Sequence, residues 1–106
     1  MKKQLVIIFL LACIRISHAQ NIMDLMQRSL DLANKGEHAR SLEVADTLYD
    51  LQPFTFESYS LIGYNQVCLG NLQKAGLYLA AGLQVEPTEY SLYINSGYYL
   101  ALKGDN

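Results

Sequence analysis

The side chains able to do chemistry are few in this sequence, and they stand apart from one another. His38 lies in GEHARS beside Glu37, and no residue at metal-ligand spacing accompanies it. Cys68 lies in the apolar stretch NQVCLG, with no histidine or other base near it in the sequence to form a thiolate. We therefore expect His38 to be a solvated surface residue and Cys68 to be a small packed residue.

The carboxylates also lack the spacing of a catalytic pair, and most fall on polar faces of predicted helices: Asp24, Asp31, Glu43, Asp46 and Asp50. Asp46 and Asp50 are four residues apart, which places both on one helix face and predicts a solvated strip. The sequence has no glycine-rich phosphate loop and no Ser-His-Asp order. We predict that the chain is not an enzyme, with no catalytic residue, cofactor or metal ion.

Residues 1–19 have the layout of a secretory signal peptide. Lys2 and Lys3 precede the apolar run LVIIFLLACI, and Ser17 and Ala19 supply the small residues before a predicted cleavage site at Gln20. The apolar run has about ten residues, whereas a helix that crosses a bilayer needs about 20. An alternative is a lipoprotein box at LLAC with a lipidated Cys13, which would leave a membrane anchor.

The rest of the chain is acidic and nearly free of cysteine. Three of the eight basic residues lie in residues 1–19 and none of the ten acidic residues does, so five against ten leaves a net charge of −5. This balance argues against a nucleic-acid partner, since phosphates require basic patches. Cys68 is then the single cysteine, so no intrachain disulfide can form and stability must come from packing.

Apolar residues recur at helical spacing throughout the remaining chain, and no stretch is typical of a strand. The pattern predicts helices near 21–34, 38–51, 55–69, 72–84 and 88–102. Several residues recur with a period of 34, the length of a helix-turn-helix repeat. They are Pro53 and Pro87; Gly36, Gly70 and Gly104; Ser29, Gly63 and Gly97; and Tyr59 and Tyr93.

The stretch YSLIGYNQVCLGNLQKAGLYLAAGLQVEP, residues 59–87, resembles a tetratricopeptide (TPR) repeat. Its matching positions are the early aromatic residue, the Leu-Gly pair, the turn glycine, the small residue of the second helix and the closing proline: Tyr59, Ile62, Gly63, Gly70, Ala75 and Pro87. Gln66 and Gly82 depart from the pattern, standing for an aromatic residue and an alanine. The resemblance covers about 85 of 106 residues.

This resemblance implies an all-α fold, a right-handed TPR-like α-solenoid of about two and a half helix-turn-helix repeats. The expected units are a signal peptide at 1–19, a divergent first repeat at 20–53, a second repeat at 54–87 and a truncated third repeat at 88–106. We expect Gly36 and Gly70 to adopt the left-handed conformation at helix ends. We also expect Gly63 to admit a close approach of the second helix, with Ala75 and Gly82 as its small contacts.

The resemblance also implies that the first helix of each repeat lines a concave surface that binds a peptide or a partner helix. The candidate groove residues are Glu57, Ser60, Leu61, Tyr64, Val67 and Cys68, and then Ser91, Ile94, Asn95, Tyr98 and Leu102. For Tyr64 and Tyr98 two positions are equally compatible with the sequence, one in the groove and one in the core. Tyr59, Tyr90 and Tyr93 are predicted to pack between helices. These two first helices carry no Lys or Arg before Lys103, which argues against a clamp for a C-terminal carboxylate.

The predicted helix 88–102 is apolar on nearly all sides, although a terminal capping helix should have a polar outer face. The sequence is therefore predicted to be a piece of a longer TPR protein, or this face is covered by a partner or by self-association with a second copy.

The predicted function is protein–protein interaction or scaffolding in a bacterial cell envelope, at the periplasm or outer-membrane surface. One alternative is the periplasmic sensing segment of a larger signalling protein. Another is a catalytic or glycan-handling protein with these repeats at its front.

Overall fold

The computed structural model describes residues 2–102, and describes the backbone alone at residues 12–17, 99, 101 and 102. Short connections in these residues join helices in the order α1 (Lys2–Asn34), α2 (His38–Leu51), α3 (Phe56–Cys68), α4 (Leu72–Val85) and α5 (Glu89–Leu102). The predicted all-α class is confirmed, and the four later helices begin and end within one residue of their predicted bounds.

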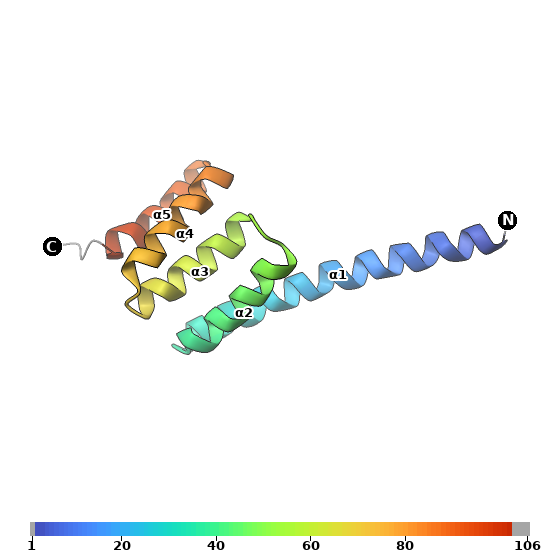
Figure 1. The fold of residues 1–106 in the computed structure, drawn as a ribbon, viewed down its shortest axis with the longest axis horizontal. Coiled ribbons are helices and arrows are strands. Elements are labelled where there is room, and N and C mark those ends of the chain that lie inside the picture. Colours follow the sequence, from blue (N-terminus) through green and yellow to red (C-terminus); the bar gives the residue numbers. More distant parts are fainter. Residues whose placement is uncertain (1, 103–106) are drawn as a thin grey trace.

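Helix α1 differs from the prediction because it continues through residues 2–20 without a break. RISHAQ holds no glycine or proline that would stop it. The first half of α1 projects away from the other helices (Figure 1), so the apolar side chains of residues 5–11 are exposed. None of the described helices combines the length and the apolar character needed to cross a membrane. The side chains of Cys13 and Ser17 lie outside those that the structure describes.

Two glycines end helices in the predicted way. Gly36 and Gly70 have φ angles of 81° and 83°, a backbone conformation that glycine adopts without steric cost. The turn after α3 is closed by a hydrogen bond from the backbone N–H of Asn71 to the carbonyl of Gln66, at 2.9 Å. The buried Gln66 side chain adds a second tie, accepting a 2.7 Å hydrogen bond from Asn71 Nδ2. Gly104 lies outside the described residues.

The starts of α3 and α5 are fixed by threonine caps. The Thr55 hydroxyl accepts a 3.3 Å hydrogen bond from the backbone N–H of Ser58. Thr88 does the same for the backbone N–H of Ser91, at 3.2 Å. Each cap satisfies a backbone donor that the first helical turn leaves unpaired. Pro53 and Pro87 lie in the two connections, after α2 and α4 have ended.

The helices pack in a repeat-like order. Each helix packs against the next one along the chain, and α3 also contacts α1 and α5 (Figure 1). The main core cluster joins the first three helices through Ile22, Ala45, Leu48, Leu61 and Ile62. Successive helix pairs therefore stack, which leaves α1, α3 and α5 in contact along one side of the array.

The close contact of Gly63 is made by a residue other than those predicted. A Cβ atom at Gly63 would lie 2.6 Å from Cδ2 of Leu79, so the missing side chain makes room for this buried leucine of α4. Gly82 instead makes room for Asn95, whose Nδ2 would lie 2.9 Å from a Cβ there. Gly97 has no such neighbour, since no described helix covers that face of α5.

Three predictions of burial are wrong. Tyr90 and Tyr93 are 71% and 78% exposed, although both were expected to pack between helices as Tyr59 does. Cys68 is an exposed free thiol at the end of α3 and not a packed residue. Tyr59 is buried between Tyr49 and Tyr78, with ring centroids 5.6 and 6.2 Å away.

Candidate binding cavity

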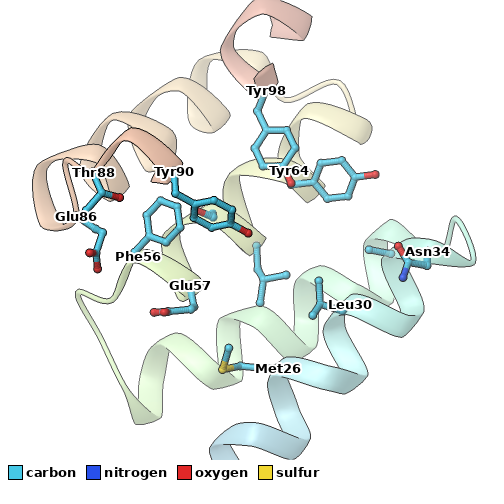
Figure 2. Close-up of a pocket in the computed structure, with 13 residues that line it drawn as sticks. Met26, Leu30, Asn34, Phe56, Glu57, Tyr64, Glu86, Thr88, Tyr90 and Tyr98 are labelled. Atoms are coloured by element: carbon cyan, nitrogen blue, oxygen red, sulfur yellow. The ribbon is translucent and has the colours of Figure 1, made fainter. Parts of the chain in front are cut away.

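A cavity of about 710 Å³ opens where α1, α3 and α5 come together. Figure 2 shows Phe56 and Tyr90 at one end of it, Tyr64 and Tyr98 at the other, and the α1 side chains across from them. The lining residues are Met26, Leu30, Ala33, Asn34, Phe56, Glu57, Ser60, Leu61, Tyr64, Glu86, Thr88, Tyr90 and Tyr98. Except for Glu86 and Thr88 of the α4–α5 connection, all come from α1, α3 and α5.

The structure brings five of the predicted groove residues together in this cavity. They are Glu57, Ser60, Leu61, Tyr64 and Tyr98. Val67 and Ile94 are half-buried and do not line it, and Ile94 lies on another face of α5. Leu102 lies outside the described side chains.

Asn95 and Ser91 are both fully buried and do not line the cavity. Asn95 Nδ2 donates a 2.9 Å hydrogen bond to the carbonyl of Leu79. Its Oδ1 accepts a 2.9 Å hydrogen bond from the hydroxyl of Ser60. With its polar atoms satisfied inside the protein, Asn95 holds α5 in place and is not free to bind a partner.

Tyr64 and Tyr98 form the aromatic wall of the cavity. Their ring centroids are 4.9 Å apart at an interplanar angle of 32°. Interaction with the Cys68 side chain, and then burial, raise the pKa of Tyr64. Burial, and then the nearby Cys68 and Tyr90, raise the pKa of Tyr98. Both phenols are therefore neutral at physiological pH, so the wall is apolar with polar tips.

His38 is half-buried behind this wall, which corrects the prediction of a solvated surface residue. Its ring meets Tyr64 edge-on, with centroids 5.7 Å apart and an interplanar angle of 82°. His38 Nδ1 lies 3.1 Å from Asn65 Oδ1. Because Asn65 Nδ2 is the donor to Ser41 and Leu61, its Oδ1 is the acceptor and His38 Nδ1 is the donor. His38 thus supports the cavity from behind.

The α1 residues of the cavity were missed by the sequence prediction, yet the 34-residue period contains the signal for them. Leu30, Tyr64 and Tyr98 are successive members of one series. Met26 and Ser60 form a second series, and Phe56 and Tyr90 a third. The groove prediction covered only the first helices of the second and third units, and the first unit has Leu30 and Met26 where the second has Tyr64 and Ser60. All of these residues line the same cavity.

The cavity offers apolar and aromatic contact, with two carboxylates at one end. Glu57 and Glu86 are both exposed, and the lining contains no basic side chain. Among the described residues, no group of three or more His, Cys, Asp or Glu side chains is placed to hold a metal ion. The arrangement is suited to binding side chains of another molecule.

A second apolar surface lies on the outer face of α5. It is lined by Leu92, Tyr93, Ile94, Gly97 and Leu100, together with Glu89, Ser96 and Tyr98. The apolar outer face that was expected for this helix is therefore present in the described residues.

No protein-family model matches the sequence, and neither a curated protein nor a solved structure is significantly similar to it.

Proposed function

We propose that the chain is a non-enzymatic, tetratricopeptide-type module that binds a segment of a partner protein in the cavity between α1, α3 and α5. The observation that carries this proposal is the series Leu30, Tyr64 and Tyr98. One residue from each of three stacked helices, at a constant spacing of 34, lies on the wall of one cavity. A continuous groove built from successive repeats is how solenoid proteins bind extended partners.

The proposed location is the bacterial cell envelope. This part rests on the charge and apolar pattern of residues 1–19, which is that of a secretory signal peptide. The acidic remainder and the tyrosine-rich cavity suit a protein partner, since tyrosine combines a large apolar surface with a polar tip.

Site-specific photo-crosslinking tests the proposal. A benzophenone amino acid replaces Tyr64 in one variant, and Leu77 in a control, in the full chain expressed in bacterial cells. Leu77 is 70% exposed on α4 and does not line the cavity. We expect discrete protein adducts from position 64 and none of the same mass from position 77. Equal labelling from both positions, or none from position 64, would contradict the proposal.

A further inference from the structure

We infer that the cavity selects a basic, apolar peptide, in which a lysine or arginine is flanked by aliphatic or aromatic side chains. This inference rests on the proposed function and names the chemistry of its partner. The basic side chain lies at the end of the cavity that carries Glu57 and Glu86. The neighbouring apolar side chains contact Leu30, Tyr64 and Tyr98.

Charge is distributed unevenly along the cavity. Glu57 and Glu86 lie at the same end, beside Phe56 and Tyr90 (Figure 2). Figure 2 shows Tyr64, Tyr98, Leu30 and the uncharged Asn34 toward the opposite end. With two carboxylates and no basic residue in the lining, an acidic peptide is repelled and a basic one is attracted.

The position of Glu86 is unfavourable for the fold by itself. It is the C-cap residue of α4, where the helix dipole favours a positive charge and disfavours a carboxylate. The ion pair found among the described residues is Arg40 with Glu37, which leaves Glu86 without a cation there. Glu57, in the first turn of α3, is well placed for helix stability. The two carboxylates therefore have different effects on their helices, and what they have in common is that both line the cavity.

The aromatic residues beside the carboxylates extend the same preference. Phe56 and Tyr90 line the cavity at its acidic end, and Tyr90 is largely exposed and therefore accessible to a ligand. Aromatic faces attract lysine and especially arginine side chains through the ring quadrupole. A cation at this end would contact both carboxylate oxygens and aromatic rings, whereas an uncharged side chain would gain only the apolar contact.

A random heptapeptide phage library, panned on the immobilised full chain, tests the inference. The wild type is compared with the variants Glu57→Gln/Glu86→Gln and Tyr64→Ala/Tyr98→Ala. Glu43→Gln/Asp50→Asn is the control, because it removes two exposed carboxylates of α2 that do not line the cavity. Circular dichroism checks that each variant keeps its helix content, and size-exclusion chromatography with light scattering gives its oligomeric state.

We expect the wild type and the control to enrich peptides with Lys or Arg beside Leu, Ile or Phe. The Glu57→Gln/Glu86→Gln variant should lose the enrichment of basic residues and keep that of apolar ones. It should also bind a labelled wild-type-selected peptide about tenfold more weakly in fluorescence anisotropy, as expected for two exposed ion pairs. That difference should shrink as the salt concentration rises.

The other outcomes separate the two proposals. Enrichment of acidic or uncharged apolar peptides would overturn the charge preference and leave the cavity as an apolar peptide groove. A wild-type dimer that dissociates in Tyr64→Ala/Tyr98→Ala would assign the cavity to a second copy and overturn the inference. Equal peptide recovery from wild type and Tyr64→Ala/Tyr98→Ala would remove the cavity as a peptide site, and with it the proposed function.

Discussion

At one position of each helix pair, 34 residues apart, the α1–α2 pair has Ser29 and the α3–α4 pair has Gly63. Ser29 is fully buried and joins α2 through hydrogen bonds with Ser41, including one from its hydroxyl to the Ser41 carbonyl at 3.1 Å. Gly63 joins α4 through the close approach of Leu79. The same register of packing is therefore held by polar contacts in one pair and by apolar contact in the other.

The difference extends along both second helices. Ser41 and Ala45 of α2 correspond, at the same spacing of 34, to Ala75 and Leu79 of α4, and all four are fully or almost fully buried. Gly63, the small residue of α3, thus stands opposite the large Leu79 of α4. Ser29 of α1 stands opposite small residues of α2. Packing density inside proteins is conserved by such exchanges, even when the chemistry is not.

The polar interface between α1 and α2 also extends to a third helix. Asn65 of α3 donates a 2.8 Å hydrogen bond to Ser41 Oγ, and its Oδ1 accepts a hydrogen bond from His38 Nδ1. The network thereby links α1, α2 and α3, and supports Tyr64 from behind. The comparison predicts that the first pair is sensitive to loss of hydrogen bonds and the second to added volume.

The largest effect is expected from Asn65→Ala, which cuts the network at its centre. It leaves the Ser41 hydroxyl and His38 Nδ1 without their shared partner and opens a small cavity. The free energy of unfolding should fall by about 2–3 kcal/mol. Urea unfolding followed by circular dichroism measures this. A loss below about 0.5 kcal/mol would show that the network contributes little and that the first helix pair does not depend on these hydrogen bonds.

Gly63→Ala should have the next largest effect. The new methyl group would lie 2.6 and 2.7 Å from Leu79 Cδ2 and Cγ, so the Leu79 side chain or the two helices must shift. After the gain in helix propensity, we expect a net destabilisation of about 1–2 kcal/mol by the same measurement. Gly97→Ala is the matched control, since nothing lies within 4 Å of a Cβ there. It should be neutral or stabilising by up to about 1 kcal/mol; equal losses in both variants would contradict the close contact.

A smaller loss, about 1 kcal/mol, is expected from Ser41→Ala, which gives α2 the residue that α4 has at Ala75. Asn65 Nδ2 keeps its hydrogen bond to the carbonyl of Leu61, and the Ser29 hydroxyl keeps the carbonyl of residue 41. A double-mutant cycle with Asn65→Ala should show strong non-additivity, because both changes remove the same hydrogen bond, that from Asn65 Nδ2 to Ser41 Oγ. Additive losses would indicate that the two side chains act separately.

The smallest effect concerns the charge on α2, which carries three acidic residues where α4 has none. Burial, and then the neighbouring Asp50, raise the pKa of Asp46, while Lys74 lowers it. A carboxyl whose pKa is raised in the folded state costs stability above that pKa, and the cost disappears as the pH falls below the unfolded value of 3.8. Asp46→Asn should therefore stabilise the chain at pH 7 by a few tenths of a kcal/mol and by nothing near pH 3. Thermal unfolding at the two pH values measures this difference. A loss of stability at pH 7 would show that the Asp46 carboxylate stabilises the fold, which contradicts the prediction.

Much of the helical framework was predictable, because the signals that set it are local. Glycine supplied the left-handed ends at Gly36 and Gly70, and the prolines marked the connections. Five of the groove candidates that the resemblance implied line one cavity. The 34-residue period, applied to the first unit, would have added Leu30 and Met26 of α1.

The tertiary structure alone decided which polar and aromatic side chains are buried. Asn65, Gln66 and Asn95 are polar in sequence, but the fold gives each a partner, and burial then costs little. Tyr90 and Cys68 lie in apolar stretches and are nonetheless exposed. Helix formation depends on neighbours along the chain, whereas the burial of a side chain depends on residues brought to it from another helix.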